Sequence, residues 1–166
     1  MTQATAQPAP ILVFGWGNPS RGDDALGPAF VASAAALPRQ PGAPEVECLT
    51  DFQLQVEHAL DLVGRSRVLF VDASVDCAAP FEVQQLRSAT QHQLTTHAMS
   101  PQAVMQVFER LNGYPPPVCT LLAIRAYQFE LGAAIGDDAQ ANLTQALAWY
   151  ARWCFSEFSP PRPPSA

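Results

Sequence analysis

The chain has 166 residues, of which 48% are hydrophobic and 14% are charged, and its formal net charge is −6. This length and composition predict one globular domain with a buried core. The acidic balance argues against a nucleic-acid partner, because proteins that bind DNA or RNA usually carry a basic face. No apolar run approaches the roughly 20 residues of a membrane span, so we expect no membrane partner.

Short apolar runs alternate with helical patterns along the chain. They predict strands at 11–16, 46–50, 67–72, 81–86 and 118–124, and helices at 25–37, 53–63, 101–111 and 137–155. The run 81–86 alternates with period two, which is typical of an edge strand, and Asp137 or Asp138 is the expected N-cap of the last helix. This order predicts an α/β fold, a mostly parallel sheet of five strands with helices on both faces.

The two ends differ in composition from the middle. Residues 1–9 are Ala, Gln, Thr and Pro after the first Met, and residues 159–166 are rich in proline. We therefore expect flexible ends around a single α/β domain over residues 10–158. The first ten residues lack the basic and long apolar regions of a secretory signal. The four cysteines form no Cys-x-x-Cys pair, so we expect a cytoplasmic protein with free thiols.

In such folds the ligand site lies outside the carboxyl ends of the strands. The first predicted strand runs into a glycine-rich loop that ends in two adjacent acids, Asp23 and Asp24. A dinucleotide fingerprint would need a glycine where Ser20 stands and a helix that starts at once, so a nucleotide-binding domain is kept only as an alternative. Helix capping accounts for one of the acids, and the other is then available to face a cleft.

Further candidate residues follow the other strands. Asp51 either caps the next helix or belongs to the site. Asp72 ends an apolar strand, where a carboxylate is unfavourable unless it has a partner or a metal. His97 precedes the helix at 101–111. Because the fold gathers these segments at one edge, Asp24, Asp72 and His97 are candidate ligands of a divalent first-row metal, although ligand type does not separate zinc, nickel, cobalt and manganese.

Other hydrolytic motifs are missing from the sequence, which has no Gly-x-Ser-x-Gly elbow, HExxH helix or Walker A loop. Cys77 is the only thiol in a predicted loop, and its neighbours are expected to raise its pKa. His58 and His92 receive no chemical role. Attack by a metal-activated water is the simplest hydrolytic mechanism left.

These residues resemble the signature of a known family, the nickel–iron hydrogenase maturation endopeptidases. The resemblance covers roughly residues 10–155 and rests most specifically on the opening glycine, asparagine and acidic stretch. The matching residues are Gly15, Gly17 and Asn18, then Asp23, Asp24 and Gly27, and in order Asp51, the strand end Val71-Asp72-Ala73 and the turn Thr95-Thr96-His97.

The resemblance implies a twisted five-stranded sheet between helices and a protease that removes a short C-terminal extension from the precursor of a hydrogenase large subunit. It implies that nickel enters the precursor first, that this substrate-borne metal is the recognition mark, and that Asp24, Asp72 and His97 bind it and serve catalysis. The supporting loop residues would be Gly15, Gly17, Asn18, Asp23 and Asp51, and the metal or a carboxylate such as Asp23 would activate water.

Two departures from the family pattern stand out. Asp24 occupies a position where glutamate is common, so its reach toward a metal is one methylene shorter. Phe52 and Gln53 follow Asp51 where many members have a glycine pair, and this run resembles the branch that serves cytoplasmic NAD-linked hydrogenases. A non-enzymatic, nickel-binding assembly factor on the same fold remains an alternative to the endopeptidase.

Overall fold

The computed structural model describes residues 6–88 and 99–156. Its five strands form one sheet in the order β2-β1-β3-β5-β4. The parallel strands are β1 (Ile11–Trp16), β2 (Val46–Asp51), β3 (Arg67–Ser74) and β5 (Val118–Arg125), and β4 (Phe81–Gln85) pairs antiparallel with β5 at one edge. The predicted α/β sheet and its edge strand are confirmed.

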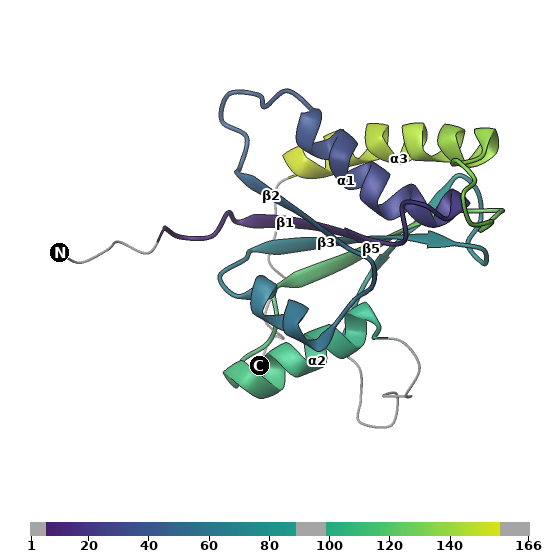
Figure 1. Ribbon diagram of the computed structural model, residues 1–166. Coiled ribbons are helices and arrows are strands. Elements are labelled where there is room, and N and C mark those ends of the chain that lie inside the picture. The colour runs from purple at the N-terminus through teal and green to yellow at the C-terminus, as the bar shows by residue number, and fades with distance from the viewer. Residues whose placement is uncertain (1–5, 89–98, 157–166) are drawn as a thin grey trace.

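Helices cover both faces of this sheet (Figure 1). The α-helices are α1 (Leu26–Ala36), α2 (Pro101–Asn112) and α3 (Asp137–Phe155), and two 3-10 helices are η1 (Gly22–Ala25) and η2 (Val56–Leu62). Alternation along β1 and β3 sends Val13 and Val71 into a core with α1 and α3. Phe14 and Phe70 point the other way, into a core with α2 and η2.

Two local predictions are wrong. The helix predicted at 53–63 is the short 3-10 helix η2, and its buried residues Ala59 and Leu62 lie three positions apart, which matches three residues per turn. The N-cap of α3 is Gly136, and neither Asp137 nor Asp138 caps that helix; both lie in its first turn. Acids are favoured there by the helix dipole even without capping.

Part of the predicted organisation falls outside the described residues: positions 1–5 of the N-terminal segment and the whole of the proline-rich tail at 159–166. Within the described part, all four cysteines are free thiols, as predicted. None of the described helices has the length and apolar character to cross a bilayer.

Candidate functional site

The strand ends on the α2 side of the sheet form a row of side chains at the carboxyl edge. From β2 to β4 this row consists of Asp51, Trp16, Asp72, Ala123 and Glu82. Its orientation follows from alternation, since Phe70 packs into the core under α2 and Asp72 lies two residues further along β3. The row therefore carries acids on both sides of Trp16 and lies where ligands bind in α/β folds.

Asp24 approaches this row from η1, the turn before α1. Its Oδ2 accepts the main-chain N–H of Asn18 at 2.8 Å, and Asn18 Oδ1 accepts the N–H of Ser20 at 2.9 Å. Gly17 has φ 144°, and a Cβ there would collide with the main-chain carbonyl of Asp24. The predicted supporting residues Gly17 and Asn18 thus hold the Asp24 carboxylate in place.

The close approach of β1 and α1 requires two more glycines. A Cβ on Gly15 would collide with the carbonyl of Gly27, and a Cβ on Gly27 would collide with the carbonyl of Trp16 and lie 3.0 Å from that of Val71. Gly15 and Gly27 therefore bring the start of α1 against the ends of β1 and β3. This contact places Asp24, just before α1, near Asp72, just after Val71.

The nucleotide-binding alternative does not fit this loop. A phosphate site needs free main-chain N–H groups, but those of the loop are already used. The Gly17 N–H is donated to the main-chain oxygen of Asp51, and the Arg21 N–H to that of Asn18, each at 3.1 Å. The Asn18 N–H is donated to the Asp24 carboxylate, and the Ser20 N–H to the Asn18 side chain. The Asp24 carboxylate would also repel a phosphate.

The pKa of Asp72 is raised to about 7, chiefly by burial. A hydrogen bond from the Ala73 amide offsets part of this rise, and the negative charge of Asp24 adds to it. A carboxyl group that titrates near neutral pH can take up and release a proton at working pH, as a general acid or base must. When ionised, Asp72 and Asp24 together offer oxygen ligands to a divalent cation.

The raised pKa predicts how the stability of the metal-free protein depends on pH. The pKa of Asp72 is about 7 when folded and about 3.9 in an unfolded chain, so the folded state binds more protons between these values. The free energy of unfolding should therefore fall as pH rises through this window and stay lower above it. We expect Asp72→Asn to raise the melting temperature relative to wild type at pH 8 but not at pH 4.

Circular dichroism melts at the two pH values check this prediction. The exposed Asp76, four residues further along the chain, provides the matched control, and Asp76→Asn should leave the melting temperature unchanged at both pH values. If the melting temperatures of Asp72→Asn and wild type differed by the same amount at pH 4 and pH 8, the raised pKa of Asp72 would be contradicted.

Asp23 has a structural role, which corrects the expectation that it activates water. Its carboxylate is fully buried, and Oδ2 accepts the N–H of Tyr127 at 2.8 Å and of Gln128 at 3.1 Å, while Oδ1 accepts that of Gly136 at 2.8 Å. With three amide donors and no access to solvent, Asp23 cannot serve a water molecule. It fastens the loop between β5 and α3 to the turn after β1.

Asp51 has a partner that the sequence did not indicate. Its Oδ1 accepts the N–H of Phe52 at 2.6 Å, and its Oδ2 lies 3.1 Å from His58 Nε2. His58 Nδ1 accepts the N–H of Gln55 at 2.8 Å, so the ring proton is on Nε2 and is donated to Asp51. Asp51 therefore does not cap the 3-10 helix, and His58 joins that helix to the edge of the site.

The third predicted metal ligand, His97, lies outside the described residues. Among residues 6–88 and 99–156, no three His, Cys, Asp or Glu side chains are grouped to hold a metal ion. The structure thus brings Asp24 and Asp72 together, and the metal-binding role of the predicted three residues stays a prediction. Figure 1 shows α2, which follows His97 in the chain, beginning at the carboxyl edge of the sheet.

No protein-family model and no curated protein matches the sequence. The NiFe hydrogenase maturation protease HycI of Thermococcus kodakarensis superposes with a TM-score of 0.68 at 17% identity, over 91% of this chain and 96% of its own. The hydrogenase maturating endopeptidase HybD of E. coli gives 0.67 at 24% identity, over 86% and 90%.

The fold is that of the hydrogenase maturation endopeptidases. A hydrogenase 2 maturation peptidase from a Thaumarchaeota archaeon is similar too, with a TM-score of 0.62 at 17% identity over 89% of this chain and 99% of its own. The sheet expected from the resemblance is therefore confirmed across almost the whole length of these proteases.

In this protease fold, a hollow of about 340 Å³ opens beside the row of strand ends. Its lining comes from the edge strand and its neighbour: Glu82, Val83, Gln84, Leu121 and Ala123. Ala123 is the register partner of both Asp72 and Glu82, so the hollow adjoins the Asp72 carboxyl group. The hollow follows three consecutive residues of the edge strand β4, Glu82 to Gln84.

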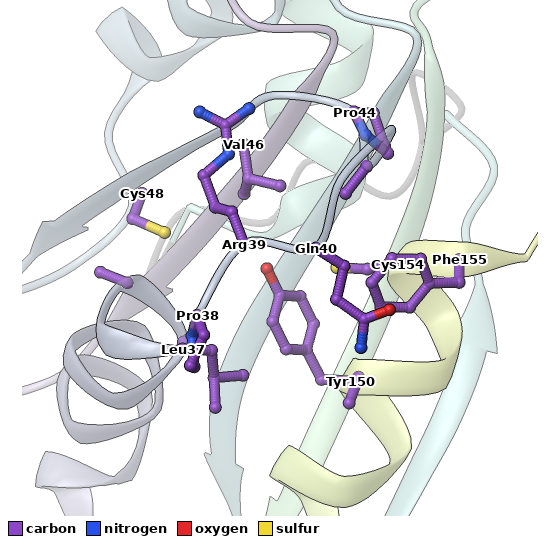
Figure 2. Close-up of a pocket in the computed structure, with 14 residues that line it drawn as sticks. Leu37, Pro38, Arg39, Gln40, Pro44, Val46, Cys48, Tyr150, Cys154 and Phe155 are labelled. Carbon is purple, nitrogen blue, oxygen red and sulfur yellow. The ribbon is translucent and has the colours of Figure 1, made fainter.

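A second pocket, of about 320 Å³, does not belong to this site (Figure 2). It is lined by the last turns of α1 and α3, the loop after α1 and the start of β2, and therefore lies at the amino ends of the strands. Burial raises the pKa of the Cys48 and Cys154 thiols and of the Tyr150 hydroxyl. These groups are neutral at pH 7, and the lining holds no carboxylate or imidazole for hydrolysis.

Proposed function

We propose that the protein is an endopeptidase that removes a C-terminal extension from the large-subunit precursor of a nickel–iron hydrogenase, in the cytoplasm and after nickel insertion. The observation that carries the proposal is the pair Asp24 and Asp72 at the carboxyl edge of a hydrogenase-protease fold, with the pKa of Asp72 raised to about 7. Buried carboxyl groups with perturbed pKa values are typical of functional sites.

In this proposal nickel belongs to the substrate and is not a resident cofactor. Asp24 and Asp72 engage the metal through their carboxylate oxygens, and His97 supplies an imidazole. His97 comes before α2 in the chain, four residues before its first residue, Pro101. Its imidazole is part of the proposal.

Metal recognition serves to position the scissile bond. Docking of the nickel against Asp24 and Asp72 places the adjoining substrate segment beside the hollow along β4, which raises the local concentration of the reacting groups. Asp72 titrates near neutral pH in the metal-free protein, and an oxygen of its carboxylate that does not bind the metal would accept a proton from the attacking water. Asp23 has no part in this step, because its oxygens are used by main-chain amides.

The test compares nickel-loaded and nickel-free precursor of the large subunit. The protein is incubated with each, and mass spectrometry follows the loss of the C-terminal fragment. Cleavage of the loaded precursor alone is expected. Equal cleavage of both forms would overturn nickel recognition, and cleavage of neither would overturn the endopeptidase.

The assembly-factor alternative makes a different prediction for the isolated protein. A nickel carrier would bind Ni²⁺ tightly without a substrate, whereas a reader of substrate-borne nickel needs only a weak site. Calorimetric titration of the isolated protein with Ni²⁺ separates the two functions. Tight binding without cleavage of loaded precursor would favour the carrier.

A further inference from the structure

The segment that follows β2 exposes several large apolar side chains. Phe52 is 67% exposed, Leu60 65%, Val56 46% and Val63 40%. We call these four residues the η2 apolar surface. Within residues 6–88 and 99–156, no element covers them. Single exposed apolar residues are common, but a group on one short segment is typical of an interaction surface.

The η2 apolar surface is held on a fixed base. Beneath it, Leu54, Ala59 and Leu62 are buried in the core that lies under α2. The His58 ring packs against Phe14 at a tilt of 58°, with ring centroids 4.5 Å apart. A fixed base lowers the entropy lost when a partner binds.

The His58 ring also makes hydrogen bonds through both nitrogens. Its Nδ1 accepts the Gln55 N–H, and its Nε2–H is donated to Asp51. These bonds join the segment that bears the η2 apolar surface to the end of β2, where the site lies. A shift of this segment would therefore also move Asp51.

Phe52, at one end of this surface, adjoins the site. Phe52 is the next residue after Asp51, which ends β2 and pairs with Trp16 in the sheet. Trp16 lies between Asp51 and Asp72 in the row of strand ends. A protein whose nickel and C-terminal segment occupy the site must therefore extend its own surface over, or past, Phe52.

We propose that the η2 apolar surface is the docking surface for the folded large-subunit precursor, with Phe52 and Leu60 as its main contacts. The inference rests on the proposed function and adds where the protein substrate is bound. An enzyme that cuts one bond of one protein gains selectivity from contacts outside the scissile segment. A few well-packed side chains supply most of the binding energy in such interfaces, and aromatic residues are enriched there.

The test measures KM and kcat for cleavage of nickel-loaded precursor by Phe52→Ser and Leu60→Ser. Loss of an apolar contact made equally in the bound substrate and the transition state raises KM and leaves kcat unchanged. We expect KM to rise by about tenfold in each variant. Because both side chains are more than half exposed, the melting temperature should not change.

Leu111 offers a matched control. It is the same residue type as Leu60 and is also 65% exposed, but it lies in the last turn of α2, at the end away from the carboxyl edge. Leu111→Ser should keep the wild-type KM. A wild-type KM in both Phe52→Ser and Leu60→Ser would overturn the docking surface, and so would an equal rise in Leu111→Ser. Failure of the wild-type protein to cleave would instead overturn the proposed function.

Discussion

Replacing Asp72 by asparagine is expected to lower the cleavage of nickel-loaded precursor by roughly a thousandfold or more. The amide has the shape of the carboxyl group but can neither accept a proton near neutral pH nor bind a cation as an anion. Burial and the Asp24 charge raise the pKa of Asp72 to about 7. Asparagine at this position has no group that titrates near neutral pH. Mass spectrometry of the precursor over time measures the loss.

Two further variants separate a site effect from a change in fold. Asp24→Asn should impair cleavage as Asp72→Asn does, because the two carboxylates act on the same metal. The exposed Asp76 again provides the control, and Asp76→Asn should cleave at the wild-type rate. Retention of more than about a tenth of the wild-type rate in Asp72→Asn would exclude it from the chemistry, since general acid–base groups contribute more than this. Normal processing by His97→Ala would show that the predicted set of three is wrong.

Much of the fold could be predicted because local patterns and tertiary packing agree. The apolar run that forms β3 is buried on both faces, as parallel strands are. Helix α2 has its apolar residues on one side, an N-cap at Ser100 and Gly113 in the left-handed conformation at its end. The prediction of a helix over 53–63 was wrong in its extent and type, because the spacing of the apolar side chains fits a helix with three residues per turn equally well. The hydrogen bond from the Gln55 N–H to His58 Nδ1 favours this tighter helix.

The site was predictable only where a residue conflicts with its surroundings. Asp72 comes directly after the apolar run Val68–Val71 within β3, so this carboxylate marks the site even when its neighbours are unknown. Asp23 gives no such signal, because the amides it accepts are 104 to 113 residues away in the sequence. The partner of Asp51 was equally hidden, since His58 lies within what the sequence predicts to be an ordinary helix.

The largest effect on stability is expected from replacing Asp23 by alanine. Three main-chain N–H groups would lose their acceptor in a fully buried place. A hydrogen bond from an amide to a charged group contributes about 1.5–3 kcal/mol to the free energy of unfolding. The contributions of neighbouring hydrogen bonds are not fully additive. We expect Asp23→Ala to lower the free energy of unfolding by about 3–5 kcal/mol, a large share of the 5–15 kcal/mol of typical domains.

Denaturant unfolding of three variants tests this effect. Asp23→Asn keeps one oxygen, which can still accept the Tyr127 and Gln128 amides, so its loss should be smaller than that of Asp23→Ala. Asp138→Ala removes an exposed acid from the first turn of α3 and should change stability by less than about 1 kcal/mol. If Asp23→Ala were as stable as Asp138→Ala, the loop before α3 would be held by other contacts. The ordered series would instead show that Asp23 fastens the loop before α3 to the turn after β1, while its neighbour Asp24 accepts the Asn18 amide and faces the site.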